Sequence, residues 1–163
     1  FMNHYYEWHR AATVLIYDKK QKISILIGQD EGTYFGVELA DNPKSVKEAF
    51  TSLIPKEIRT VKGLQRQGEW FAVQVAEKNV PEVEECQLEC SNTSDNISLG
   101  REGLDSARHF VNATEVRIKD GQIYSKNASL VHERGDHQAL QTTGWVVYHR
   151  NTAKRAFSVQ GVD

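Results

Sequence analysis

Long apolar runs and an excess of charge of either sign are both missing from this sequence. No stretch reaches the roughly 18 apolar residues that a membrane-spanning helix needs, and the first ten residues are too polar for a signal peptide. Lys and Arg number 20 against 22 Asp and Glu, a net charge of −2. This balance excludes a protein-wide basic field for nucleic acids, although not a local basic patch. We therefore expect a cytoplasmic protein with no membrane partner.

Cysteine is also scarce, because the chain holds only Cys86 and Cys90. Two thiols in a chain without a secretory signal are typical of a reduced intracellular protein. Their C-x3-C spacing is weak evidence for zinc, since structural zinc sites usually combine two such pairs. A disulfide between them is the least favoured reading. Whether they join a functional site is left open by the sequence.

The N-terminal part of the chain predicts a β-hairpin, a third strand and a helix. Polar residues 18–22 separate the β-branched stretches 10–17 and 23–28, and a second turn at 29–32 leads to a strand over 33–39. Apolar side chains then recur at helical spacing at positions 46, 49, 50, 53 and 54. Asn42 is the expected N-cap, Pro43 suits the first turn, and Pro55 ends the helix.

The remaining chain predicts mostly short strands. Stretches 69–76 and 81–88 have strand composition, whereas residues 90–106 are rich in Ser, Asn, Asp and Gly and predict a long mobile loop. A meander follows, with a hairpin at Asp120-Gly121, then strands over 128–133, 136–141, 144–150 and 155–160. The fold class expected is α+β: a β-rich single domain over residues 1–163, with a mostly antiparallel meander sheet and one clear packed helix.

The strongest candidate site is a hairpin that carries two histidines and an aspartate. If Arg134-Gly135 is a two-residue loop, His132 lies opposite His137, and directly opposed residues have Cβ atoms about 4.5–5.5 Å apart. Asp136 sits beside the turn, and His109 precedes the same meander. Strand parity places His109, His132 and His149 with apolar neighbours, which indicates a half-buried cluster. We therefore name His109, His132, His137 and Asp136 as candidate catalytic residues.

Three kinds of chemistry fit this cluster, and the spacing does not separate them. Two imidazoles can act as base and acid on a phosphodiester. Three imidazoles, or two with Asp136, can hold a divalent transition metal that activates water. The cluster can also bind phosphate without turnover. Whether a metal is bound at all is therefore left open.

Other residues are candidates for holding a substrate. Arg66 and Gln67 carry donors suited to phosphate or carboxylate and precede Gly68, which permits a close approach at the start of a strand. Arg150 follows the Trp145 strand and can neutralise a phosphate. Tyr124 lies in the same meander as the histidines. The candidate substrate-binding residues are thus Arg66, Gln67, Tyr124 and Arg150.

The motif order resembles an uncharacterised family of bacterial and phage proteins. The similarity rests on RQGEWF at residues 66–71, on His109 and Tyr124, on the histidine segment 132–137, and on the stretch 145–152. The family pattern has R-Q-G-E/D-W-F-F, R-H-x-D-H and a W-H…N-T ending. Here the histidine segment is two residues longer, and Val146 stands where the pattern has histidine. The family has no assigned activity, so the resemblance supports a site and not a reaction.

Two functions follow as expectations, and the sequence leaves open which of them holds and whether the protein is an enzyme. The first is a hydrolase that acts on a phosphodiester or nucleotide-like substrate through the histidines, with a nucleotide or nucleic acid as partner. The second is a non-catalytic binding or accessory protein of a phage or mobile element, with a structural metal or a ligand at the histidines. Histidines that face inward around a pocket favour the first, and histidines scattered over a surface favour the second.

Overall fold

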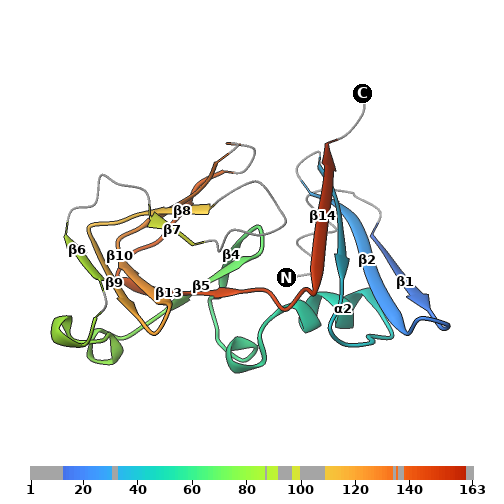
Figure 1. The fold of residues 1–163 in the computed structure, drawn as a ribbon, viewed down its shortest axis with the longest axis horizontal. Helices are drawn as coiled ribbons and strands as arrows, with labels where there is room; N and C mark the ends of the chain where they lie inside the picture. The colour runs from blue at the N-terminus through green and yellow to red at the C-terminus, as the bar shows by residue number, and fades with distance from the viewer. Residues whose placement is uncertain are drawn as a thin grey trace. The chain divides into compact units, whose positions relative to one another are not determined.

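The computed structural model describes residues 13–30, 33–86, 88–91, 97–99, 109–133, 135 and 138–160. Within them the chain forms strands, one α-helix and three short 3-10 helices (Figure 1). All strand pairs are antiparallel. The expected β-rich α+β class, with antiparallel sheets and a packed helix, is confirmed. No helix in these residues is long and apolar enough to span a membrane.

The chain divides into two compact units, residues 1–60 with 151–163 and residues 61–150. That the two units form a single domain over residues 1–163 stays a prediction.

The first unit holds a four-stranded sheet and the helix. Its strand order is β1-β2-β3-β14, with bounds Val14–Asp18, Ile23–Asp30, Thr33–Glu38 and Arg155–Gln160. The expected hairpin over residues 10–28 is confirmed for its described part, because Asp18 pairs with Ile23. The second turn is shorter than expected, since β2 continues to Asp30, which pairs with Thr33.

Helix α2 (Val46–Leu53) packs on this sheet as its apolar spacing predicted. Ala49, Phe50 and Leu53 are buried together with Leu26 and Val37 of the sheet. The expected cap was wrong, however. Ser45 and not Asn42 is the N-cap, because its hydroxyl accepts the Glu48 N–H at 3.1 Å. Asn42 instead accepts a hydrogen bond from the Ser24 hydroxyl at 3.0 Å. A 3-10 helix, η1 (Lys56–Ile58), follows.

The second unit is built from two sheets on one core. The larger sheet has the order β4-β5-β13-β10-β9-β6 and the smaller one β12-β11-β8-β7. Buried side chains of both sheets and of the residues beside them form one cluster, which includes Ala72, Val116 and Val146 on one side and Val111 and Leu130 on the other. The bounds are β4 Gln65–Gln67, β5 Trp70–Gln74, β6 Leu88–Ser91, β7 Ile97–Ser98, β8 His109–Asn112, β9 Glu115–Lys119, β10 Gln122–Lys126, β11 Ser129–His132, β12 Leu140–Gln141 and β13 Trp145–Arg150.

Turn chemistry explains the Asp120-Gly121 hairpin, which is confirmed. Lys119 pairs with Gln122, and both turn residues have positive φ, 51° and 74°. A two-residue turn of this kind needs two left-handed residues, and Asp-Gly supplies them at low cost. The strand expected over 81–88 was wrong. Residues Val83–Glu85 form a 3-10 helix, η3, after another one, η2 (Glu77–Asn79), and β6 begins only at Leu88.

The loop expected over 90–106 is interrupted by strands. Cys90 and Ser91 belong to β6, and Ile97–Ser98 form β7, which pairs with β8. Polar composition hid these short strands, because their pairing partners and not their own sequence hold them in place. The other residues of this stretch, except Leu99, lie outside the described residues, so the mobility of the loop stays a prediction.

A buried hydroxyl in the second unit predicts how its stability depends on pH. The Tyr148 hydroxyl lies 2.9 Å from the Ser125 hydroxyl in the core. Burial raises the pKa of the Tyr148 phenol, and its hydrogen bonds with Ser125 and Thr142 offset part of that rise. Above about pH 10 the unfolded chain therefore loses this proton before the folded chain does. The free energy of unfolding should fall as pH rises through that range.

Tyr148→Phe should flatten this alkaline loss, because it removes the ionising group. At neutral pH the variant should lose about 0.5–1.5 kcal/mol with the hydrogen bond. Urea denaturation between pH 7 and 11 measures both effects. Tyr17→Phe, at an exposed tyrosine, is the control. An equal alkaline slope in wild type and Tyr148→Phe would contradict the assignment.

Candidate functional site

Two of the candidate histidines lie side by side in the second unit. His109 of β8 and His132 of β11 are direct partners across the antiparallel pair, with ring centroids 4.7 Å apart and ring planes at 42°. Their exposed fractions are only 2% and 8%. Directly paired residues point to the same face of a sheet. The register of β8 with β11 therefore creates the cluster, through a pairing that the sequence analysis did not include.

The pairing expected between His132 and His137 was based on the wrong register. Ser129 pairs with Gln141 and Leu130 with Leu140, whereas a two-residue Arg134-Gly135 loop would pair Leu130 with Ala139. The Gly135 N–H donates to the His132 carbonyl at 3.0 Å, so the turn closes one residue earlier than expected. A slip by one residue changes which side chains face each other. His137 and Asp136 themselves lie outside the described residues.

The hairpin turn between β4 and β5 packs directly against His109. Gln67 pairs with Trp70, which leaves Gly68 and Glu69 as the turn residues. Gly68 has a φ of +53°, and a Cβ built on it would lie 2.9 Å from His109 Nε2 and 3.0 Å from Cε1. Only glycine can adopt this positive φ without strain and also leave room for the His109 ring. The turn thus covers the edge of the imidazole that carries Nε2.

Glu69 places a carboxylate beside the other nitrogen of the same ring. Its Oε1 lies 3.6 Å from His109 Nδ1, and its side chain is 33% exposed. This distance fits an ion pair but is longer than a good hydrogen bond. A carboxylate in this place favours a proton on Nδ1. Glu69, His109 and His132 together form the imidazole cluster, of which Glu69 is the exposed member.

Arg66 and Gln67, two of the candidate substrate-binding residues, hold the turn. Arg66 Nε donates to the Gly68 carbonyl at 2.6 Å, and Gln67 Nε2 donates to the Gln138 carbonyl at 2.6 Å. Gln67 is buried, and its Oε1 has no hydrogen-bond partner within the described structure. These side chains therefore bind main-chain carbonyls beside the cluster.

The other two candidate substrate-binding residues, Arg150 and Tyr124, lie on two further strands of the larger sheet, β13 and β10. Arg150 is the exposed last residue of β13 and pairs with Trp70, which in turn pairs with Gln67. Tyr124 of β10 pairs with Val147 and with Arg117. Residues directly paired across strands share a face. Val116, Ser125 and Val146 point into the core, so Tyr124 lies on the opposite, outer face.

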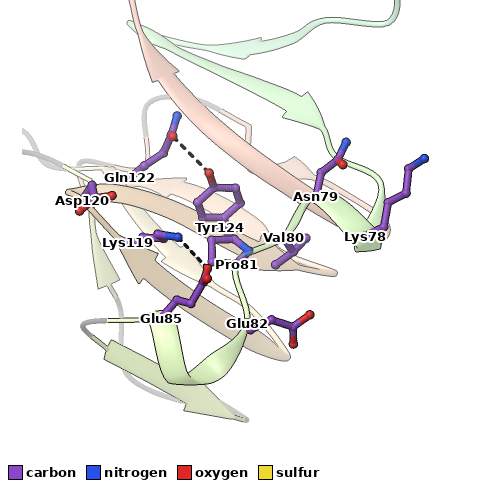
Figure 2. A pocket seen from close by; sticks show the side chains of 10 residues that line it. All are labelled: Lys78, Asn79, Val80, Pro81, Glu82, Glu85, Lys119, Asp120, Gln122 and Tyr124. Carbon is purple, nitrogen blue, oxygen red and sulfur yellow. Dashed lines mark hydrogen bonds and ion pairs between the residues drawn. The ribbon is translucent and has the colours of Figure 1, made fainter.

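Tyr124 lines a hollow of about 420 Å³ on this outer face (Figure 2). The residues around it come from the turn of β9 and β10 and from the segment that contains η2 and η3. They are Lys78, Asn79, Val80, Pro81, Glu82, Glu85, Lys119, Asp120, Gln122 and Tyr124. No histidine is among these described lining residues. This hollow was not predicted from the sequence, although the acidic run after β5 and the basic residues around Asp120-Gly121 were visible signals.

The comparisons leave family and ligand open. Within the described part of the chain, no group of three or more His, Cys, Asp or Glu side chains is placed to hold a metal ion. Comparison of the chain with protein-family models, with curated proteins and with solved structures found no match. The resemblance to the bacterial and phage family therefore stays a prediction.

The contact between Gly68 and His109 can be tested with a matched pair of glycines. Gly63 also has positive φ, +72°, but a Cβ there would meet nothing within 4 Å. Gly63→Ala should cost about 1–2 kcal/mol of stability through backbone strain alone. Gly68→Ala should cost about 1–3 kcal/mol more, because the methyl group also collides with His109. Chemical denaturation of both variants measures the difference, and equal losses would show that the turn does not press on the imidazole.

Proposed function

We propose that this protein is a non-catalytic binding protein in which the pair His109–His132 supports the structure. The observation that supports the proposal is the burial of both rings, at exposed fractions of 2% and 8%, with the Gly68 turn packed against His109. A general acid or base must come within about 2.6–3.2 Å of the atom whose proton it transfers. Rings this deeply covered do not offer that approach.

The ligand that we propose for this protein is a nucleotide-like molecule. We further propose that the protein is located in the cytoplasm and is an accessory protein of a phage or mobile element, as the resemblance implies. What supports a ligand of this class is the hollow beside Tyr124, which combines an aromatic ring with Lys119 and several hydrogen-bonding side chains.

A hydrolase is the second candidate, and one observation favours it. Glu69 lies 3.6 Å from Nδ1 of His109, and carboxylates commonly orient catalytic imidazoles in this way. In that case His132 would be the second imidazole, and the turn at Gly68 would have to open for a substrate to enter. His137 and Asp136 stay candidates for the same site.

A hydrolysis assay separates the two candidates. Wild type, His109→Gln and His132→Gln are incubated with bis(4-nitrophenyl) phosphate and with a cyclic nucleotide, each with Mg²⁺, Mn²⁺ or Zn²⁺. We expect no turnover above buffer for any protein. We expect both substitutions to lower the free energy of unfolding by about 1–3 kcal/mol, because each disturbs a buried polar group.

His149→Gln, which changes a half-buried histidine on β13 outside the pair, is the control. Metal content of the same purified proteins, measured by mass spectrometry, tests the structural-metal alternative. Turnover by the wild type that both substitutions abolish in folded protein would overturn the non-catalytic proposal. It would establish the hydrolase instead.

A further inference from the structure

An acidic segment is held against the outer face of the larger sheet in the second unit. This segment, residues 77–86, carries four glutamates and one lysine and contains η2 and η3. Basic side chains of β9 and β10 hold it. Lys119 Nζ lies 2.6 Å from Glu85 Oε2, Lys126 Nζ lies 3.4 Å from Glu77 Oε1, and Arg117 Nη1 donates to the Pro81 carbonyl at 2.7 Å.

The basic side chains are positioned by the sheet itself. Register places Arg117 beside Tyr124 and Lys126 beside Trp145 on the same outer face. The Arg117 guanidinium lies 5.0 Å and the Lys126 ammonium 5.6 Å from the centre of the buried Trp145 ring, distances that fit cation–π contacts. Arg117 and Lys126 would therefore stay in place on the outer face if the acidic segment were displaced.

The ion pairs between the segment and the sheet are exposed and exchangeable. In the pair Lys119–Glu85 the side chains are 37% and 53% exposed. The hydrogen bond that Lys119 donates to the Glu85 carboxylate is the main cause that raises the pKa of Lys119. Exposed pairs of this kind are weak, because water and salt screen the attraction and both side chains lose conformational freedom. A second anion can therefore replace Glu85 on Lys119 at little cost.

The hollow beside this ion pair is lined both by aromatic and apolar groups and by polar and charged groups (Figure 2). The Tyr124 ring is oriented by the hydrogen bond from its hydroxyl to Gln122 Oε1, at 3.2 Å, and Val80 and Pro81 add apolar surface. Among the polar groups, Asn79 and Gln122 supply amide donors and acceptors. The charged groups are the ammonium groups of Lys78 and Lys119 and the carboxylates of Glu82, Glu85 and Asp120. An aromatic face next to a cation suits a ligand with a flat base and a phosphate.

We propose that this hollow binds a nucleoside phosphate, whose phosphate replaces Glu85 on Lys119 and whose base packs against Tyr124. The acidic segment then acts as an internal competitor for the same cation. Inorganic phosphate would gain nothing from the Tyr124 wall, and an uncharged nucleoside would leave the pair Lys119–Glu85 intact. The inference rests on the proposed binding function and names its site and ligand class.

Calorimetric titration of the full chain with adenosine 5′-monophosphate tests this site. Glu85→Gln should bind about fivefold more tightly than wild type, a factor that corresponds to about 1 kcal/mol of relieved charge repulsion. Lys119→Gln and Tyr124→Leu should each weaken binding at least fivefold. Glu84→Gln, on the same segment but not in the hollow, and Lys20→Gln, in the β1–β2 turn, should bind like wild type.

Three further probes identify the source of the phosphate. Inorganic phosphate and adenosine should bind at least tenfold more weakly than the monophosphate, and equal binding of either would overturn the inference. A 12-residue oligothymidylate distinguishes a polymer from a free nucleotide. Tighter, Glu85-dependent binding of this oligomer supports a nucleic-acid strand as the source, and weaker binding supports a free nucleotide.

The outcomes also separate this inference from the proposed function. Absence of monophosphate binding to both wild type and Glu85→Gln at millimolar concentration would overturn the inference, and with it the nucleotide-like ligand. It would leave the structural, non-catalytic role of the pair His109–His132 standing. Binding that follows Lys119 and Tyr124, together with hydrolysis that depends on His109, would overturn the proposed function and leave the site. Equal binding by Glu84→Gln and Glu85→Gln would also overturn the inference, because it would show a non-specific effect of charge.

Discussion

Side chains on an antiparallel strand alternate between two faces, and in residues 61–150 the shared core of the two sheets fixes which face is which. Val116 and Val146 of the larger sheet and Val111 and Leu130 of the smaller one are fully buried in this core. Once those positions point inward, Arg117, Tyr124 and Lys126 must point outward. The inner histidine pair and the outer hollow are both consequences of this alternation.

The histidine pair shows how polar groups can be accommodated next to such a core. His109 and His132 face each other across β8 and β11, and the Gly68 turn closes over one ring edge while Glu69 lies beside the other nitrogen. Buried polar groups are costly without partners. Gly68, Glu69 and His132 therefore form one local arrangement around the buried His109 ring.

The outer face combines weak and strong contacts in a way that suits exchange. Arg117 is anchored by Glu115, by the Pro81 carbonyl and by the Trp145 ring, and it is well covered. Lys119 and Lys126 have only exposed glutamates of the acidic segment as ion-pair partners in the described structure. Salt screens exposed pairs much more than covered ones. The acidic segment is therefore held more weakly at Lys119 and Lys126 than at Arg117.

Local patterns in the sequence were enough to predict the local elements. Apolar spacing predicted the helix with buried Ala49, Phe50 and Leu53, and Asp120-Gly121 predicted a hairpin. Both predictions were possible because the signal for each element is contained in a few consecutive residues. The sequence also marked His109 and His132 as residues of interest. Long-range contacts in the folded protein set the pairing of these two histidines, the packing of the Gly68 turn on His109, and the place of residues 77–86 beside Tyr124. Each of these contacts joins segments far apart in the chain, and strand register, which no local pattern encodes, sets them.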